Sequence, residues 1–337
     1  MTNLAASAKN PSNNKKNLKY SKKRFKSEEK VKKPKTPEIK LVISDVDGVI
    51  RLQDYKTIHE TYLKALKAAG FKNKELKRFN QETTHALRKL TPFINEREKF
   101  FKLLFHLTKA NENEFKSVTE SAKKGKEDEV LKFLEEREKL KSDRISNSIL
   151  QKMNEAYKFR YDEEKLKEIK PYKGAFEGLK LLEKLGIRVV FVSSAPRESI
   201  KQWFEIHYGK NSSKKFSFLG KEDVKMQKPS SEGIFKALEL SGIDRKNALY
   251  VGDHVNDIIS GNEAGVYTVG VLSDLSSVKE FLEHDPHYIF NSFKELAEWL
   301  EGKKVDFEKR HSKKKVVKVS CEALKQEKKI RMMFSAG

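Results

Sequence analysis

The hydrophobic pattern divides the chain into short buried strands and a long helical region inserted near its start. Residues 41–43 are continuously apolar, and an acidic pair and a glycine follow shortly after them. A short apolar run of this kind is typical of a strand buried on both faces of a parallel sheet. Strand alternation then directs Asp45 and Asp47 to the same side, at the carboxyl end of that strand.

Residues 55–169 have the pattern of several consecutive helices. Apolar residues recur at helical spacing, as at positions 62, 63, 66 and 69, and lysine–glutamate pairs line the outward faces. No glycine occurs between Gly70 and Gly125, and Pro92 is the only proline of this region. A helical insert of this length, placed directly after a strand that ends in two carboxylates, predicts a lid or cap over a site.

From Pro171 onward, apolar strands alternate with helices. The strands are expected at residues 187–192, 216–219, 247–251, 266–271 and 287–290. Repeated β-α-β connections imply a parallel sheet with helices on both faces. The predicted fold is therefore α/β: a three-layer doubly wound parallel sheet made of residues 39–54 and 170–302, with residues 55–169 inserted as an α-helical cap.

Charge is concentrated at the two ends of the chain. The formal net charge is +22; residues 1–38 carry twelve lysines and arginines against three glutamates, and residues 303–337 carry twelve against four acids. Residues 1–38 are almost free of branched apolar residues, so we predict a disordered basic tail there. Residues 303–337 are predicted as a second basic tail. Its two small apolar clusters leave open whether it forms a strand and a short amphipathic helix or remains unfolded.

Composition excludes several classes of protein. The single cysteine, Cys321, rules out a disulfide framework within one chain. No apolar run approaches the roughly 18–20 residues that cross a bilayer, and the N-terminus lacks the apolar core of a secretory signal. We therefore expect a soluble, cytoplasmic protein, and leave its oligomeric state open.

Polar residues follow several of the predicted strands in a fixed order. They are an acidic pair, two hydroxyls, a lysine and a second acidic pair: Asp45 and Asp47, Ser193 and Ser194, Lys228, and Asp253 and Asp257. Each of these is common alone, as a turn or a helix cap. In an open α/β sheet, however, ligands bind at the carboxyl ends of the strands, so the order as a whole indicates one site.

These motifs resemble the haloacid dehalogenase (HAD) superfamily, chiefly its Mg²⁺-dependent phosphatases of the phosphoglycolate phosphatase and β-phosphoglucomutase type. The four motifs of that family correspond to Asp45-Val-Asp47-Gly48, Ser193, Lys228-Pro229, and Gly252-Asp253 with Asp257. The resemblance spans about residues 39–300, and the helical insert stands where the family has its type-1 cap. The chain differs in having Ser193 where threonine is commoner, and two serines after Lys228-Pro229.

The resemblance implies phosphoryl transfer through an aspartyl-phosphate. Asp45 would be the nucleophile, and Asp47 would protonate the leaving oxygen and later activate water. Because the dehalogenase branch has no acid at the place of Asp47, this residue favours phosphoryl transfer over cleavage of a carbon–chlorine bond. Lys228, Ser193 and Ser194 would hold the phosphoryl oxygens.

The resemblance also implies a Mg²⁺ cofactor, since Mg²⁺ takes oxygen ligands. The ligands would be the carboxylates of Asp45 and Asp253 and the backbone carbonyl of Asp47. Asp257 would support them, by holding a metal-bound water or Lys228.

Three functions follow from the resemblance and from the charge of the chain. The first is a Mg²⁺-dependent phosphatase acting on a small phosphorylated metabolite, such as phosphoglycolate or a sugar phosphate. The second is a phosphomutase, which needs a cap residue that shields the aspartyl-phosphate. Arg51 and His59 are its candidates, although residues at such positions usually lie on the surface. The third is a phosphatase that its basic tails target to nucleic acid, although solvated tails explain the same charge.

Overall fold

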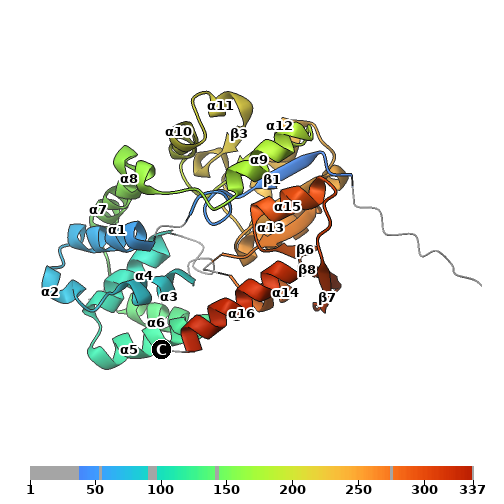
Figure 1. Cartoon of the computed structure of the whole chain (residues 1–337). Coiled ribbons are helices and arrows are strands. Elements are labelled where there is room, and N and C mark those ends of the chain that lie inside the picture. Colours follow the sequence, from blue (N-terminus) through green and yellow to red (C-terminus); the bar gives the residue numbers. More distant parts are fainter. Residues whose placement is uncertain (1–37, 53–54, 90–96, 141–143, 274–275, 336–337) are drawn as a thin grey trace, which may run out of the picture. The chain divides into compact units, whose positions relative to one another are not determined.

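The computed structural model describes residues 38–52, 55–89, 97–140, 144–273 and 276–335 (Figure 1). The predicted N-terminal basic tail therefore lies outside the described residues, apart from its last position. Among the described residues, no helix combines the length and the apolar character needed to cross a membrane.

One eight-stranded sheet organises the chain, in the order β3-β2-β1-β4-β5-β6-β8-β7. Its strands are β1 (Leu41–Ser44), β2 (Arg188–Val192), β3 (Ser217–Leu219), β4 (Ala248–Gly252), β5 (Tyr267–Val271), β6 (Tyr288–Phe290), β7 (Phe307–His311) and β8 (Val316–Ser320). The first six lie at the predicted positions. All neighbouring pairs are parallel except β7 with β8, which is antiparallel. The predicted α/β fold is confirmed, with an antiparallel edge strand that was not predicted.

Strand alternation explains why the strands read as continuous apolar runs. In β1, Val42 packs into the cluster on one face of the sheet, whereas Leu41 and Ile43 pack into the cluster on the other face. All three side chains are fully buried. A strand covered on both faces has no solvent side, so its sequence shows no polar alternation.

Helices cover both faces of the sheet. On the face of Val42 lie α8 (Glu163–Glu168), α9 (Ala175–Lys184), α10 (Arg197–His207) and α15 (Phe293–Leu300). On the other face lie α12 (Glu232–Ser241), α13 (Val255–Ala264), α14 (Val278–Leu282) and α16 (Cys321–Ser335). The short helix α11 (Ser212–Lys215) precedes β3.

The inserted region is helical, as its periodicity indicates. It contains α1 (Tyr55–Ala68), α2 (Asn73–Leu76), α3 (Gln81–Lys89), α4 (Arg97–Lys109), α5 (Glu112–Lys123), α6 (Glu127–Lys139), α7 (Asn147–Tyr157) and the 3₁₀ turn η2 (Lys158–Tyr161). These helices have a hydrophobic core of their own, in which Phe101 and Leu104 are nearly fully buried. Leu166 of α8 packs instead into the core under the sheet. The change from insert to core packing therefore falls earlier than the predicted boundary at residue 170.

Residues 303–337 were predicted as a basic tail beyond the core, with a strand and a short helix left open; the structure has both and adds the strand to the sheet. Strand β8 pairs with β6 in parallel, and β7 pairs with β8 at the edge. Val317, Val319 and Ala323 are fully buried against β6, α13 and α14. This segment is rich in lysine and has few apolar residues, because an edge hairpin buries few side chains. Its composition is therefore similar to that of a solvated tail. The sheet extends past the predicted end of the core at residue 302.

Candidate active site

The site lies where the strand order of the sheet reverses. Strand β1 has β2 on one side and β4 on the other, and Ser44 is in register with Val251. Asp45 follows β1 and Asp253 follows β4, so these two acids emerge side by side at the carboxyl edge. This switch point is where open α/β sheets bind ligands, because the loops on its two sides diverge.

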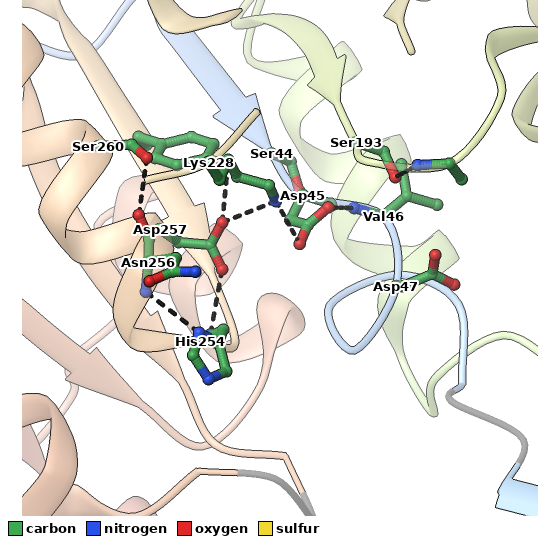
Figure 2. A network of polar contacts seen from close by, with 12 residues as sticks. Ser44, Asp45, Val46, Asp47, Ser193, Lys228, His254, Asn256, Asp257 and Ser260 are labelled. Carbon is green, nitrogen blue, oxygen red and sulfur yellow. Dashed lines mark hydrogen bonds and ion pairs between the residues drawn. The ribbon is translucent and has the colours of Figure 1, made fainter. Parts of the chain in front are cut away.

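Asp45 is held by its own loop and by Lys228, a largely covered lysine whose side chain is 13% exposed (Figure 2). Its side chain is buried, and Oδ1 accepts a hydrogen bond from the backbone N–H of Val46 at 2.7 Å. The other oxygen, Oδ2, lies 2.6 Å from Nζ of Lys228. The backbone N–H of Asp45 donates to the carbonyl of Val251 at 2.9 Å, and this hydrogen bond joins the loop to β4. The carboxylate is therefore fixed in direction by contacts to both of its oxygens.

Lys228 connects Asp45 to Asp257. Its Nζ lies 2.8 Å from Oδ1 of Asp257, which also accepts a hydrogen bond from the hydroxyl of Tyr250 at 2.8 Å. Oδ2 of Asp257 accepts from the backbone N–H of His254 at 3.1 Å. Burial alone would lower the pKa of Lys228, but Asp257 and Asp45 raise it well above its usual value. Lys228 is therefore a fixed positive charge at the site.

Asp253 completes a cluster of three buried carboxylates. One oxygen from each of Asp45, Asp253 and Asp257 can be chosen so that all three lie within 4.8 Å of one another. Burial, helped by the charges of Asp257 and Asp47, raises the pKa of Asp45 to about 7, although Lys228 acts in the opposite direction. Burial, Asp45 and Asp257 raise the pKa of Asp253 well above its usual value. Without a bound cation, the site binds protons more strongly than ordinary carboxylates do.

These residues fit a Mg²⁺ ion. Three buried carboxylates face one lysine, so the cluster has an excess of negative charge that a divalent cation would balance. The donors are hard oxygens, which Mg²⁺ prefers. Asp257 already accepts three hydrogen bonds, whereas Asp45 and Asp253 flank the switch point. That difference favours Asp45 and Asp253 as ligands, with Asp257 as their support.

Gly48 allows Asp253 to occupy its position. Gly48 has φ +85°, and a Cβ atom added to it would lie 1.9 Å from Oδ2 of Asp253. A Cβ atom added to Gly252 would likewise lie only 2.1 Å from Cγ of Asp257. The glycines of the first and fourth motifs are therefore required by close packing against the acids, beyond the turn that the sequence suggests.

Asp47 lies apart from the carboxylate cluster. Figure 2 shows its side chain turned away from Asp45. It accepts two hydrogen bonds from Arg51, from Nε to Oδ1 at 2.8 Å and from Nη2 to Oδ2 at 2.9 Å. Arg51 is only 1% exposed, so the expectation that it lies on the surface is wrong. His59, the other mutase candidate, is half-buried, and its Nδ1 lies 2.8 Å from Oγ1 of Thr84.

The two serines differ in their surroundings. Ser193 is buried at the end of β2; its N–H donates to the carbonyl of Leu219 at 3.0 Å, and its Oγ accepts from the N–H of Ala195 at 3.1 Å. Ser194 is exposed. Strand β2 adjoins β1, so Ser193 lies at the same edge as Asp45.

Sequence reasoning missed three contributions to this site. Tyr250 and the backbone of His254 bind Asp257, and Arg51 binds Asp47. A signal was present for Tyr250, because a hydroxyl-bearing side chain interrupts an otherwise apolar strand. Arg51 gave no comparable signal, since a charged residue after a strand usually lies in solvent.

Comparison with known proteins agrees with this geometry. Residues 117–271 match the family described as haloacid dehalogenase-like hydrolase. Pyrophosphatase PpaX of Halalkalibacterium halodurans is 25% identical over 139 residues, which are 39% of this chain and 60% of that protein. Phosphoglycolate phosphatase of Neisseria gonorrhoeae is 33% identical over 143 residues, 40% of this chain and 58% of that protein. The chain thus spans about three-fifths of the length of these relatives.

A solved structure shares the fold. The crystal structure of a hydrolase from Pseudomonas syringae has a TM-score of 0.53 and 17% identity, and the match covers 78% of this chain and 98% of that one. This chain has a doubly wound sheet with a helical insert after its first strand, and acids lie at the switch point of the sheet. The structural match shows the shared fold, and the family match of residues 117–271 confirms the predicted resemblance to the haloacid dehalogenase superfamily.

Proposed function

We propose that this protein is a Mg²⁺-dependent phosphatase that hydrolyses a small phosphorylated metabolite. The observation that carries the proposal is the buried cluster of Asp45, Lys228, Asp253 and Asp257 at the switch point. It combines a fixed carboxylate, a fixed positive charge and a pair of acids suited to a divalent cation. The names of the two curated relatives, a pyrophosphatase and a phosphoglycolate phosphatase, support a phosphorylated substrate.

Substrate binding would place the phosphoryl group above Asp45. Lys228 and the hydroxyl of Ser193 would hold two phosphoryl oxygens, and backbone N–H groups near Asp47 and Ser194 would add donors. These groups stabilise the charge that shifts onto the phosphoryl oxygens during transfer. A bound Mg²⁺ would neutralise part of that charge and orient the phosphoryl group.

Two proton transfers would accompany the two displacements. In the first, the Asp45 carboxylate attacks phosphorus and the bond to the leaving oxygen breaks, while protonated Asp47 gives its proton to that oxygen. In the second, Asp47 takes a proton from water, which attacks phosphorus and releases phosphate and the free Asp45 carboxylate. The proton balance closes because Asp47 acts as acid and then as base.

The test is release of phosphate from p-nitrophenyl phosphate by wild type and Asp45→Asn, with and without Mg²⁺. We expect release by wild type in Mg²⁺ only, and a loss of at least about 10³-fold in the variant, because no other side chain replaces the nucleophile. Equal release by the two proteins would overturn the proposal. Lys72→Met, which changes an exposed lysine of the insert, is the control and should keep the wild-type rate.

A further inference from the structure

Arg51 is a buried arginine whose side chain is committed to one partner. Both side-chain hydrogen bonds that it donates within the described chain go to Asp47, at 2.8 and 2.9 Å. Its third donor nitrogen, Nη1, is buried and has no hydrogen-bond partner among the residues that the structure describes. A buried guanidinium is costly to desolvate and would normally use all of its donors. The unused donor indicates that the ion pair between Arg51 and Asp47 fixes the position of Asp47 more than it stabilises the fold.

The backbone fixes Arg51 relative to Asp47. The N–H of Gly48 donates to the carbonyl of Arg51 at 2.8 Å, and the N–H of Arg51 donates to the carbonyl of Val46 at 2.9 Å. On its other side, Arg51 forms an isolated bridge with Pro171, and its guanidinium carbon lies 5.7 Å from the centre of the Trp203 ring. The guanidinium therefore has little freedom, and two parallel hydrogen bonds transfer that rigidity to the carboxylate.

A second arginine reaches Asp47 from the insert. Arg160 of η2 interacts electrostatically with Asp47, and its Nη1 donates to the hydroxyl of Tyr157 at 2.7 Å. Arg160 is half-buried, and its guanidinium carbon is 5.1 Å from the centre of the Tyr161 ring. No hydrogen bond between Arg160 and Asp47 is seen in the described chain, so Arg51 alone supplies a directional contact from an arginine.

The direction of Asp47 suits one step of the proposed reaction. In a phosphoryl transfer the attacking and leaving oxygens lie on opposite sides of phosphorus. An acid that serves the leaving oxygen must therefore lie apart from the nucleophile, on the far side of the phosphoryl group. Asp47 is turned away from Asp45 in Figure 2, and Arg51 holds it there.

We propose that Arg51 is a positioning residue, which fixes the carboxylate of Asp47 beside the leaving oxygen of the substrate. This inference rests on the proposed function. Arg51 acts only through Asp47, so it should matter for the rate of turnover much more than for substrate affinity. It should also matter most where the leaving group needs a proton.

A double-mutant cycle tests this directly. Arg51→Met, Asp47→Asn and the double variant are compared with wild type in Mg²⁺, using p-nitrophenyl phosphate and glycerol phosphate. We expect Arg51→Met to lower kcat for glycerol phosphate at least about 10-fold with KM changed less than about 2-fold, since acid–base groups contribute 10²–10⁴-fold. For p-nitrophenyl phosphate, whose leaving group needs no proton, the loss should be smaller. In the Asp47→Asn background, removing Arg51 should cost less than about 2-fold.

Two further variants control the cycle. Arg51→Lys keeps the charge but loses the two parallel hydrogen bonds, so it should restore only part of the lost kcat. It also replaces Arg51→Met if that variant fails to fold; its smaller loss of kcat should likewise disappear in the Asp47→Asn background. Arg78→Met removes an arginine of the insert that contacts Glu112 and the carbonyl of Ala110, and it should leave both kinetic constants unchanged.

Equal losses of kcat with and without Asp47 would overturn the inference, as would an effect confined to KM or no effect at all. If wild type shows no turnover that depends on Asp45, the proposed function itself is wrong and this inference falls with it. If turnover depends on Asp45 but the cycle is additive, only the role of Arg51 is wrong.

Discussion

Gly48 and Asp253 pack so closely that no larger residue fits at position 48. Gly48→Ala should lower Mg²⁺-dependent turnover by about 10²-fold, because the new Cβ would lie 1.9 Å from the Asp253 carboxylate and displace it. Phosphate release and thermal unfolding measure the two effects. Gly70→Ala is the matched control: Gly70 also has a positive φ, +99°, but nothing lies within 4 Å of the added Cβ. It should lose about 1–2 kcal/mol of stability and no activity. Equal loss of activity in both would contradict the packing explanation.

Asp253 and Asp257 should respond in opposite directions when their charge is removed. The pKa of Asp253 is raised on folding, so the native state binds its proton more strongly than the unfolded chain. Its contribution to stability is therefore present at low pH and is lost as pH rises. Asp253→Asn should raise the melting temperature of the metal-free protein at pH 8 more than at pH 5, and abolish stabilisation by Mg²⁺. Asp257→Asn should lower the melting temperature of the metal-free protein, because Lys228 loses a charged partner.

The contradicting result is a lower melting temperature for metal-free Asp253→Asn at pH 8. It would mean that the ionised acidic cluster does not destabilise the protein when no cation is bound. Differential scanning calorimetry in a chelator, followed by titration of Mg²⁺, gives both readings from one preparation.

The seven residues predicted for the site could be named because each lies just after a strand or near the start of a helix, and the hydrophobic pattern reveals these elements. Parallel strands bring their carboxyl ends to one edge, so order along the chain becomes proximity in space. The direction of a side chain does not follow from this rule. Asp45 and Asp47 share a predicted side, yet the loop turns after β1 and Arg51 draws Asp47 away. The pattern also gave no sign that Arg51 is buried, because its burial depends on Trp203 and Pro171, which are distant in sequence.

At the scale of elements, the attachment of the β7–β8 hairpin should depend on pH. Nδ1 of His287 accepts a hydrogen bond from the N–H of Thr268 at 3.1 Å and lies 3.2 Å from Nζ of Lys315. Burial, and secondly Lys315, lowers the pKa of His287 to about 4. Between this value and the ordinary histidine pKa of about 6.5, the unfolded chain binds more protons than the native state. Stability should therefore fall as pH is lowered from 7 towards 4.

Urea unfolding at pH 7 and pH 5 measures this loss. Lys315→Met removes the positive charge next to His287 and should make the decrease smaller than in wild type. A decrease that is the same in both proteins would show that Lys315 has no part in it.

The hairpin also offers a test of whether residues 303–337 belong to the core. Val317→Ala should cost roughly 1–3 kcal/mol, since Val317 is fully buried and its loss leaves a cavity under α16. Val316→Ala, one residue earlier and 48% exposed, should cost much less. Chemical denaturation of the two variants decides the matter, and equal small losses would mean that the hairpin does not pack on the sheet.

The strands β1 to β6 were predictable because short, mostly apolar runs stand out in a chain this polar. The pairing of the hairpin was not predictable, since β7 is mostly charged and only three residues of β8 are buried. Its pairing depends on the free edge of β6, and an edge is a property of the assembled sheet. The packing of α8 on the core was missed for a different reason: α8 follows α7 after only the turn η2 and Asp162, so the sequence shows no change from helix to another type of element.

At the scale of the whole molecule, two segments are added to the core of β1 to β6. They are the helical insert after β1 and the C-terminal hairpin β7–β8 with α16. The match to the Pseudomonas syringae hydrolase covers nearly all of that protein but 78% of this one, so about a fifth of this chain has no counterpart there. The described part of the basic C-terminal segment is built into the sheet, so deleting it would expose β6 instead of removing a tail. A test of nucleic-acid targeting therefore requires charge substitutions at exposed lysines such as Lys313 and Lys314.

If Asp45 is the nucleophile, it carries the phosphoryl group during turnover. Wild type is mixed with Mg²⁺ and substrate, quenched in acid within milliseconds and digested, and the peptides are examined by mass spectrometry. We predict a phosphoryl group on Asp45, which disappears after hydroxylamine treatment and is absent from Asp45→Asn. A phosphoryl group on another residue, or phosphate release by wild type and by Asp45→Asn at the same rate, would contradict the account.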